Sequence, residues 1–120
     1  MATSPPAVLI DLGETQKYVL LRVTPAAGAG AASLYVRGAA AAEFHADVQA
    51  AFEASLLAAA GPRASLECLG GGRITFAAPS SYRVHGYSVA FGRADHAAAA
   101  AMLAAALPAG SAVSHDDEGY

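Results

Sequence analysis

Half of the apolar residues in this chain are alanines, and this limits the cores that it can build. Of the 66 hydrophobic residues among 120, 33 are alanines and only 27 are Val, Ile, Leu, Met or Phe. Alanine adds one methyl group and favours helices, so the larger side chains must fill most of the interior. At this length we expect a single domain spanning residues 1–120.

Composition also excludes several classes of protein. No stretch approaches the roughly 18 to 20 strongly apolar residues of a membrane span, and the N-terminus lacks the basic region of a signal peptide. The net charge of −3 argues against a nucleic-acid binder. The single cysteine, Cys68, excludes an intrachain disulfide. We therefore expect a cytoplasmic monomer with no nucleic-acid or membrane partner.

The pattern of apolar and turn-forming residues predicts an α+β domain with two helices around one sheet. A loose N-terminal arm is expected at residues 1–14, in which residues 7–12 could add a short strand. Helices are predicted at 39–60 and from about Asp95, a good N-cap, to Leu107. Strands are predicted at 17–23, 34–37, 65–69, 73–77, 82–91 (the longest) and 112–114.

Each predicted helix has one apolar face. In the first helix that face is expected to consist of Phe44, Val48, Phe52 and Leu56, spaced four residues apart. The start of this helix is left open by its local sequence, anywhere from Ala39 to His45. In the second helix the face is expected to consist of Ala99, Met102, Leu103, Ala106 and Leu107.

Basic residues stand beside glycines in a way that suits anion binding. Arg73 follows Gly70, Gly71 and Gly72, which are expected to form a loop between two strands whose exposed N–H groups could face a phosphate. The other basic residues at strand ends or beside glycines are Lys17, Arg37 and Arg93. The glycines match no nucleotide-binding motif, because no helix follows them.

Cys68 and the histidines offer other chemistries. Four residues separate Cys68 from Arg73, where the cysteine phosphatases need five and a following helix, so an inward-facing thiol is the better interpretation. His85 and His96 have no partner at metal-ligand spacing, so no metal site is expected. His96 is explained as a residue of the first helical turn, His115 lies in the tail, and His45 stands beside the apolar face of its helix.

Several stretches together resemble the Janus family of small phosphohistidine phosphatases, and they occur in the family's order. They are KYVLLRV (17–23), YVRG (35–38), EFHADV (43–48), LECLGGGRI (66–74), HGYSVAFGRADHA (85–97) and the C-terminal Gly-Tyr. The resemblance implies a mixed sheet of about five to six strands flanked by two helices. It also implies hydrolysis of phosphate from phosphohistidine-containing proteins, with no metal or cofactor.

The resemblance carries over to individual positions. It implies that His45 is the catalytic histidine, as a general base or a transient nucleophile. Phosphate is expected to contact Lys17, Arg73 and Ser88, and backbone N–H groups around His45, Ala46 and Ala90. Arg37 matches an arginine near the pocket. Phe44 stands where the family often has tyrosine, and therefore lacks a hydroxyl group.

Two further expectations follow from this resemblance. Backbone N–H groups at His45 and Ala46 can bind phosphate only in the first turn of a helix, so the regular helix should begin near His45. The alternative function is a non-catalytic module that binds phosphorylated proteins, because Janus-type proteins include members associated with sex-specific regulation. Retention of His45, Lys17 and Arg73 favours the enzyme.

Overall fold

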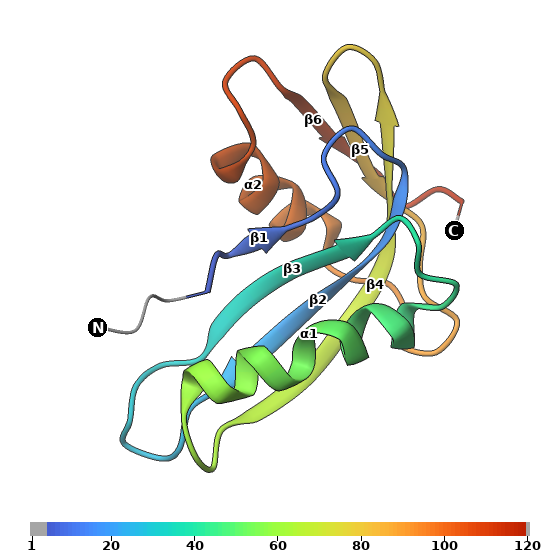
Figure 1. The fold of residues 1–120 in the computed structure, drawn as a ribbon. Helices are drawn as coiled ribbons and strands as arrows, with labels where there is room; N and C mark the ends of the chain where they lie inside the picture. Colours follow the sequence, from blue (N-terminus) through green and yellow to red (C-terminus); the bar gives the residue numbers. More distant parts are fainter. Residues whose placement is uncertain (1–4, 120) are drawn as a thin grey trace.

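The computed structural model describes residues 5–119, which form one mixed sheet and two helices (Figure 1). The sheet order is β1-β3-β2-β4-β5-β6. The strands are β1 (Val8–Leu9), β2 (Gln16–Thr24), β3 (Ser33–Ala39), β4 (Ser65–Ala77), β5 (Ser81–His85) and β6 (Ala112–His115). The helices are α1 (His45–Ala60) and α2 (His96–Ala106). The α+β prediction is confirmed.

The sheet is antiparallel in its centre and parallel at its two edges. β2 pairs with β3 on one side and with β4 on the other, and β4 pairs with β5, all antiparallel. The short strands β1 and β6 run parallel to β3 and β5. β1 lies in the predicted N-terminal arm and forms the short strand considered there, whereas residues 1–4 and Tyr120 lie outside the described residues.

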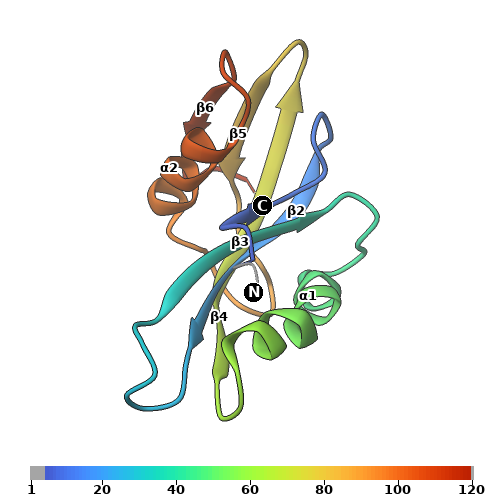
Figure 2. The ribbon, with the colours of Figure 1, turned by 60° about the vertical axis from the view of Figure 1, so that its left-hand side comes forward.

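The two helices cover opposite faces of the sheet (Figure 2), and β2 supplies core residues to both. Tyr18 and Leu20 pack in the cluster beneath α2, while Val19, Leu21 and Val23 pack in the cluster beneath α1. Alternate residues of a strand point to opposite faces, so a central strand covered on both sides must be apolar almost throughout. This explains the sequence of 17–23.

No helix within residues 5–119 has the length and apolar character to cross a membrane.

α1 begins at His45, which confirms the expectation derived from the phosphate-binding requirement. Phe44 precedes the helix in an extended conformation, with φ −127° and ψ 155°. The predicted apolar face is therefore wrong at Phe44, whose side chain is 61% exposed, and correct at the buried Val48 and Leu56. A residue outside the helix does not follow the helical rotation that places Val48 and Leu56 on the sheet.

β4 runs without interruption through the triple glycine, which corrects the prediction of two strands around a loop. Gly70, Gly71 and Gly72 pair with Leu20, Val19 and Tyr18 of β2. The register shifts between Leu20 and Leu21, so β4 carries a bulge at its glycine segment. The backbone of these glycines pairs within the sheet, and Gly71 N–H also donates to the Gly92 carbonyl oxygen (3.0 Å). It does not form an anion-binding loop.

The predicted strand at 82–91 is wrong beyond His85, where β5 ends. Gly86 has φ 81°, a left-handed conformation that breaks the extended chain. Residues 86–92 then form a loop closed by two backbone bonds between Ser88 and Gly92 (3.1 and 2.8 Å). The longest strand is β4 instead.

α2 starts as predicted, because the Asp95 carboxylate accepts a hydrogen bond from Ala98 N–H (3.1 Å). Ala99 and Leu103 face the core as expected, whereas Ala106 is exposed and the prediction is wrong there. Ala100 takes a core position that the predicted face did not include. Alanines on this face let α2 approach the sheet closely.

Candidate active site

A cavity of about 480 Å³ lies where the start of α1 meets the loop between β5 and α2. These two segments are far apart in sequence and lie side by side in space (Figure 1). We call this cavity the His45 pocket. It is lined by Lys17, Phe44, His45, Ala46, Arg73, Tyr87, Ser88, Val89 and Ala90. All but one of the site residues predicted from the sequence therefore come together here.

His45 is held against β4 by a hydrogen bond from its Nε2 to the Gly72 carbonyl oxygen (2.8 Å). A carbonyl oxygen only accepts, so Nε2 carries the proton and Nδ1 has the free lone pair of the neutral ring. Gly71 allows the ring to lie this close, since a Cβ there would be 2.7 Å from His45 Cδ2. The fold thereby selects one tautomer of the histidine.

The pKa of His45 is lowered below its usual value of 6.5. Burial is the largest cause, since it disfavours the charged ring, and the positive charges of Lys17 and Arg73 lower the pKa further. The bond to the Gly72 carbonyl acts in the opposite direction. The lowered pKa favours the neutral ring, which is the form able to accept a proton.

Lys17 and Arg73 are directly opposite each other on the antiparallel pair β2 and β4. Residues paired in this way project to the same face of a sheet, so both cations extend toward the pocket. The ion pairs within residues 5–119 are Arg22–Glu67 and Arg83–Asp116, and neither involves these two side chains. Two uncompensated cations beside a neutral histidine suit an anionic ligand.

Ser88 and the start of α1 add hydrogen-bond donors. Ser88 is buried, and its Oγ accepts a bond from Phe91 N–H (3.1 Å), which leaves the hydroxyl proton available to donate. His45 and Ala46 are the first two residues of α1, where backbone N–H groups have no acceptor within the helix. Together these groups can hold an anion by hydrogen bonds from two sides.

Arg37 is the predicted site residue that the structure does not bring to the pocket. Its side chain is 2% exposed and donates to the carbonyl oxygens of Val36 (3.0 Å) and Pro6 (2.8 Å). The guanidinium also lies over the rings of Tyr35 and Phe52. These contacts tie the N-terminal segment to β3, and they give Arg37 a structural role.

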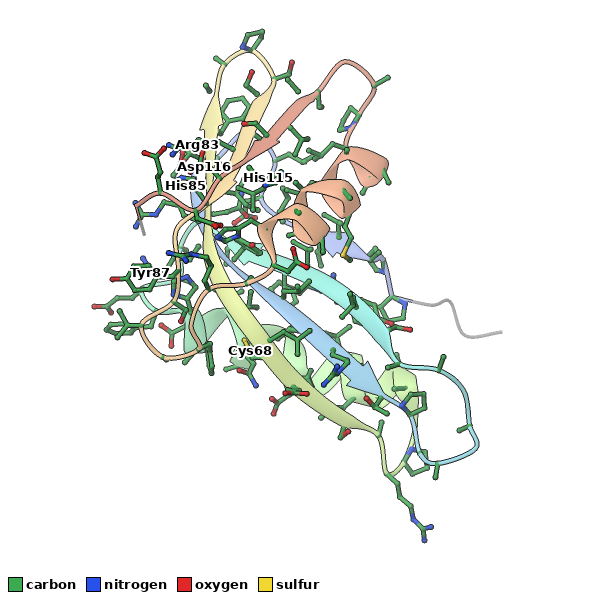
Figure 3. The ribbon with its side chains drawn as sticks, turned by 180° about the vertical axis from the view of Figure 1, so that it is seen from behind. Cys68, Arg83, His85, Tyr87, His115 and Asp116 are labelled. Atoms are coloured by element: carbon green, nitrogen blue, oxygen red, sulfur yellow. The ribbon has the colours of Figure 1, made fainter. Side chains whose placement is uncertain are left out.

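Cys68 also lies outside the His45 pocket. Its thiol packs in the cluster beneath α1, and burial raises its pKa. In Figure 3 Cys68 lies on β4, apart from Tyr87, which lines the pocket. A thiol with a raised pKa is protonated at neutral pH and is a poor nucleophile. The arrangement therefore disfavours a cysteine phosphatase.

His96 anchors the pocket loop, a role that the sequence did not reveal. Its Nε2–H donates to the Gly86 carbonyl oxygen (2.6 Å), and its Nδ1 accepts from the Tyr18 hydroxyl (2.5 Å). The side chain is buried between β2, α2 and the first residue of the loop. The sequence shows only a histidine in the first turn of a helix, because its partners are 10 and 78 residues away.

Within residues 5–119, the remaining histidines belong to no group that could bind a metal ion. His85 accepts from the Thr75 hydroxyl (2.6 Å) and donates to the Glu118 carbonyl (3.1 Å), close to the Arg83–Asp116 ion pair (Figure 3). His115 is exposed on β6. In the described part of the chain, no three His, Cys, Asp or Glu side chains are grouped so that they could hold a metal ion.

The fold and the pocket together describe a small α+β domain that presents a histidine and two cations at the start of a helix. A family model described as the Janus/Ocnus family matches residues 3–110. The chain belongs to this family.

Named relatives fall into two groups of similar identity. The sex-regulated protein janus-A of Drosophila pseudoobscura pseudoobscura is 38% identical over 119 residues, which cover 96% of this chain and 77% of that protein. The 14 kDa phosphohistidine phosphatase of Sus scrofa is 37% identical, covering 96% of this chain and 92% of the relative. The phosphatase of that name from Homo sapiens is 39% identical, covering 86% and 84%.

Proposed function

We propose that this protein is a metal-independent phosphohistidine phosphatase that acts on phosphohistidine-containing proteins, with His45 as its general base. The observation that carries the proposal is the His45 ring, held in one tautomer by its bond to Gly72, in the same pocket as Lys17 and Arg73. Two relatives named 14 kDa phosphohistidine phosphatase support the substrate class. The cytoplasmic location and the monomeric state remain predictions from composition.

In the proposed reaction the phosphoryl group lies between the cations and the backbone N–H groups of His45 and Ala46. Lys17 and Arg73 offset the charge that the phosphoryl oxygens carry in the transition state, and Ser88 and the N–H groups fix its orientation. Water attacks phosphorus and gives a proton to Nδ1 of His45. The P–N bond breaks, and its electron pair goes to the substrate ring. That ring is already protonated at its other nitrogen, so it leaves as a neutral imidazole.

A second role for His45 uses the same atom. Nδ1 could attack phosphorus directly and carry the phosphoryl group until water removes it. A single-turnover reaction quenched in alkali distinguishes the two roles. The general-base mechanism gives no phosphorylated enzyme at any time point, whereas the nucleophilic mechanism gives an alkali-stable phosphohistidine at residue 45.

The proposed function is tested by phosphate release from a phosphohistidine peptide in the presence of a chelator. We expect turnover of this peptide and no turnover of a phosphotyrosine peptide, because the neutral imidazole released from a protonated phosphohistidine is a far better leaving group than a phenolate. Tight binding of the phosphohistidine peptide without phosphate release would assign the binding-module function instead. Activity that requires an added metal ion would contradict the mechanism.

The pH dependence of kcat/KM should follow the protonation of His45. The ring must be neutral to act as a base, so activity falls as the pH drops through its pKa, and the acid limb of the wild-type profile lies below pH 6.5. In Lys17→Ala one cause of the lowered pKa is removed, and the limb moves to higher pH. KM should also rise about tenfold, since a charge-assisted bond to phosphate is lost.

Arg22→Ala is the matched control for this prediction. It removes one positive charge from the same strand, but Arg22 pairs with Glu67 away from the pocket. The control should keep the wild-type acid limb and KM on the same peptide. Equal profiles for Lys17→Ala and the wild type would show that Lys17 does not influence His45.

A further inference from the structure

Three exposed apolar side chains surround the mouth of the His45 pocket. Within residues 5–119 the large hydrophobic side chains that are exposed are Leu9, Leu12, Leu34, Phe44, Tyr87 and Val89. Three of these, Phe44, Tyr87 and Val89, line the pocket, and we call them the apolar rim. Val89 is 89% exposed, the highest value among the six. Apolar side chains gathered at a cavity indicate a binding surface.

The backbone that carries the apolar rim is held in place on both sides of the pocket. Phe44 N–H donates to the Asp47 carboxylate (3.0 Å) at the start of α1. On the other side, the two backbone bonds between Ser88 and Gly92 close the turn that bears Val89, and the Ser88 hydroxyl oxygen supports it from within. A rigid surface loses little conformational entropy on binding, so the rim is organised before the ligand arrives.

The pocket combines two positive charges with the apolar rim. Lys17 and Arg73 are the permanently charged side chains among its lining residues, and no carboxylate of the described chain lines it. The cavity of about 480 Å³ is several times larger than a single phosphoryl group requires. A phosphoryl group held by the cations therefore leaves room for the rest of its carrier beside the apolar rim.

We infer that the apolar rim binds a large apolar side chain next to the phosphohistidine in the substrate. This inference rests on the proposed function, because the phosphohistidine must be anchored in the pocket for its neighbour to reach the rim. An aliphatic or aromatic neighbour buries Val89 and Phe44 on binding, which is favourable in proportion to the apolar area removed from water. A neighbouring aspartate would lose hydration without gaining a partner.

The test uses three phosphohistidine peptides that differ only in the residues flanking the phosphohistidine: leucine, serine or aspartate. We expect kcat/KM for the leucine peptide to exceed that for the serine peptide about tenfold. This difference should come from a lower KM for the leucine peptide. The aspartate peptide should be the poorest substrate. Val89→Ser and Phe44→Ser should each reduce the leucine-to-serine ratio toward one. Serine at residue 44 is a favoured N-cap, so the second variant preserves α1.

Leu34→Ser is the matched control, since Leu34 is an exposed apolar residue of β3 that does not line the pocket. It should keep the wild-type ratio. Equal kcat/KM values for the three peptides, unchanged in Val89→Ser, would overturn the inference while leaving the proposed function in place. A wild-type dimer that dissociates in Val89→Ser would also overturn it, by assigning the rim to a second copy of the chain.

A binding measurement separates this inference from the proposed function. Peptides in which the phosphohistidine is replaced by a stable phosphonate analogue are titrated with wild type, Val89→Ser and Leu34→Ser. If no peptide is hydrolysed, but the leucine analogue still binds about tenfold more tightly than the serine analogue, the proposed enzyme is wrong and the rim inference holds. If the analogues bind equally, the rim inference fails whatever the catalytic result.

Discussion

His45→Ala should reduce phosphate release from a phosphohistidine peptide by about 100-fold to 10,000-fold, the contribution expected of a general base. The substitution removes Nδ1, the nitrogen left unprotonated by the bond to Gly72, so no group in the pocket replaces it. The fold should persist, because the ring is only half-buried and its loss removes one hydrogen bond, worth about 1 kcal/mol. Initial rates at saturating peptide measure the effect.

His115→Ala is the control for this experiment. His115 is exposed on β6 and does not line the His45 pocket, so its removal should leave the rate unchanged. Thermal unfolding of both variants checks that any lost activity is not lost structure. Wild-type activity in a folded His45→Ala variant would eliminate His45 as the base. Retained binding of a phosphohistidine peptide by this variant would show that the phosphate contacts survive without it.

Gly72→Ala should lower the free energy of unfolding by about 3 kcal/mol or more, the upper range for an overpacked core. An added Cβ would lie 2.5 Å from the His85 carbonyl oxygen, 2.5 Å from His96 Cε1 and 3.0 Å from Tyr18 Cε1. Two of these neighbours, His96 and Tyr18, are held by other hydrogen bonds, since the His96 ring is bonded to both the Tyr18 hydroxyl and the Gly86 carbonyl. Urea unfolding measures the loss.

Gly28→Ala is the control, a glycine substitution that makes no steric contact. Gly28 lies in the loop between β2 and β3 with φ +83°, and an added Cβ would meet no atom within 4 Å beyond its own chain neighbours. Alanine there costs only the strain of a left-handed conformation, about 1 kcal/mol. Similar small losses for the two variants would show that β4 can move away from α2 at Gly72.

Local sequence was sufficient to predict the helices and strands that have short-range signals, such as a regular apolar spacing or an N-cap. The apolar run of β2, the N-cap at Asp95 and the spacing of Val48 and Leu56 each indicate structure within a few residues. The resemblance to the Janus family supplied the start of α1 and most of the pocket residues. Those positions were predicted because they belong to short, distinctive motifs.

Other features depended on contacts between distant segments. Glycines normally interrupt strands, yet Gly71 and Gly72 are part of β4. Glycine is required at these two positions because His45 on one face and His96 on the other leave no room for a side chain. Apolar residues at 86–91 favoured a strand, but the left-handed Gly86 and the Ser88–Gly92 bonds made a loop instead. Neither outcome is visible in local periodicity.

The fold class, the helices and strands with local signals, and the family whose motifs the chain carries could thus all be predicted from the order of its residues. Which ring nitrogen of His45 is free, that Arg37 packs beside Tyr35 and Phe52, and that Phe44 and Val89 meet at one mouth emerged only from the folded molecule. The physical reason is distance along the chain. Periodicity and capping act within a few residues, whereas hydrogen bonds such as His45 to Gly72, 27 residues apart, form only when the sheet brings their partners together.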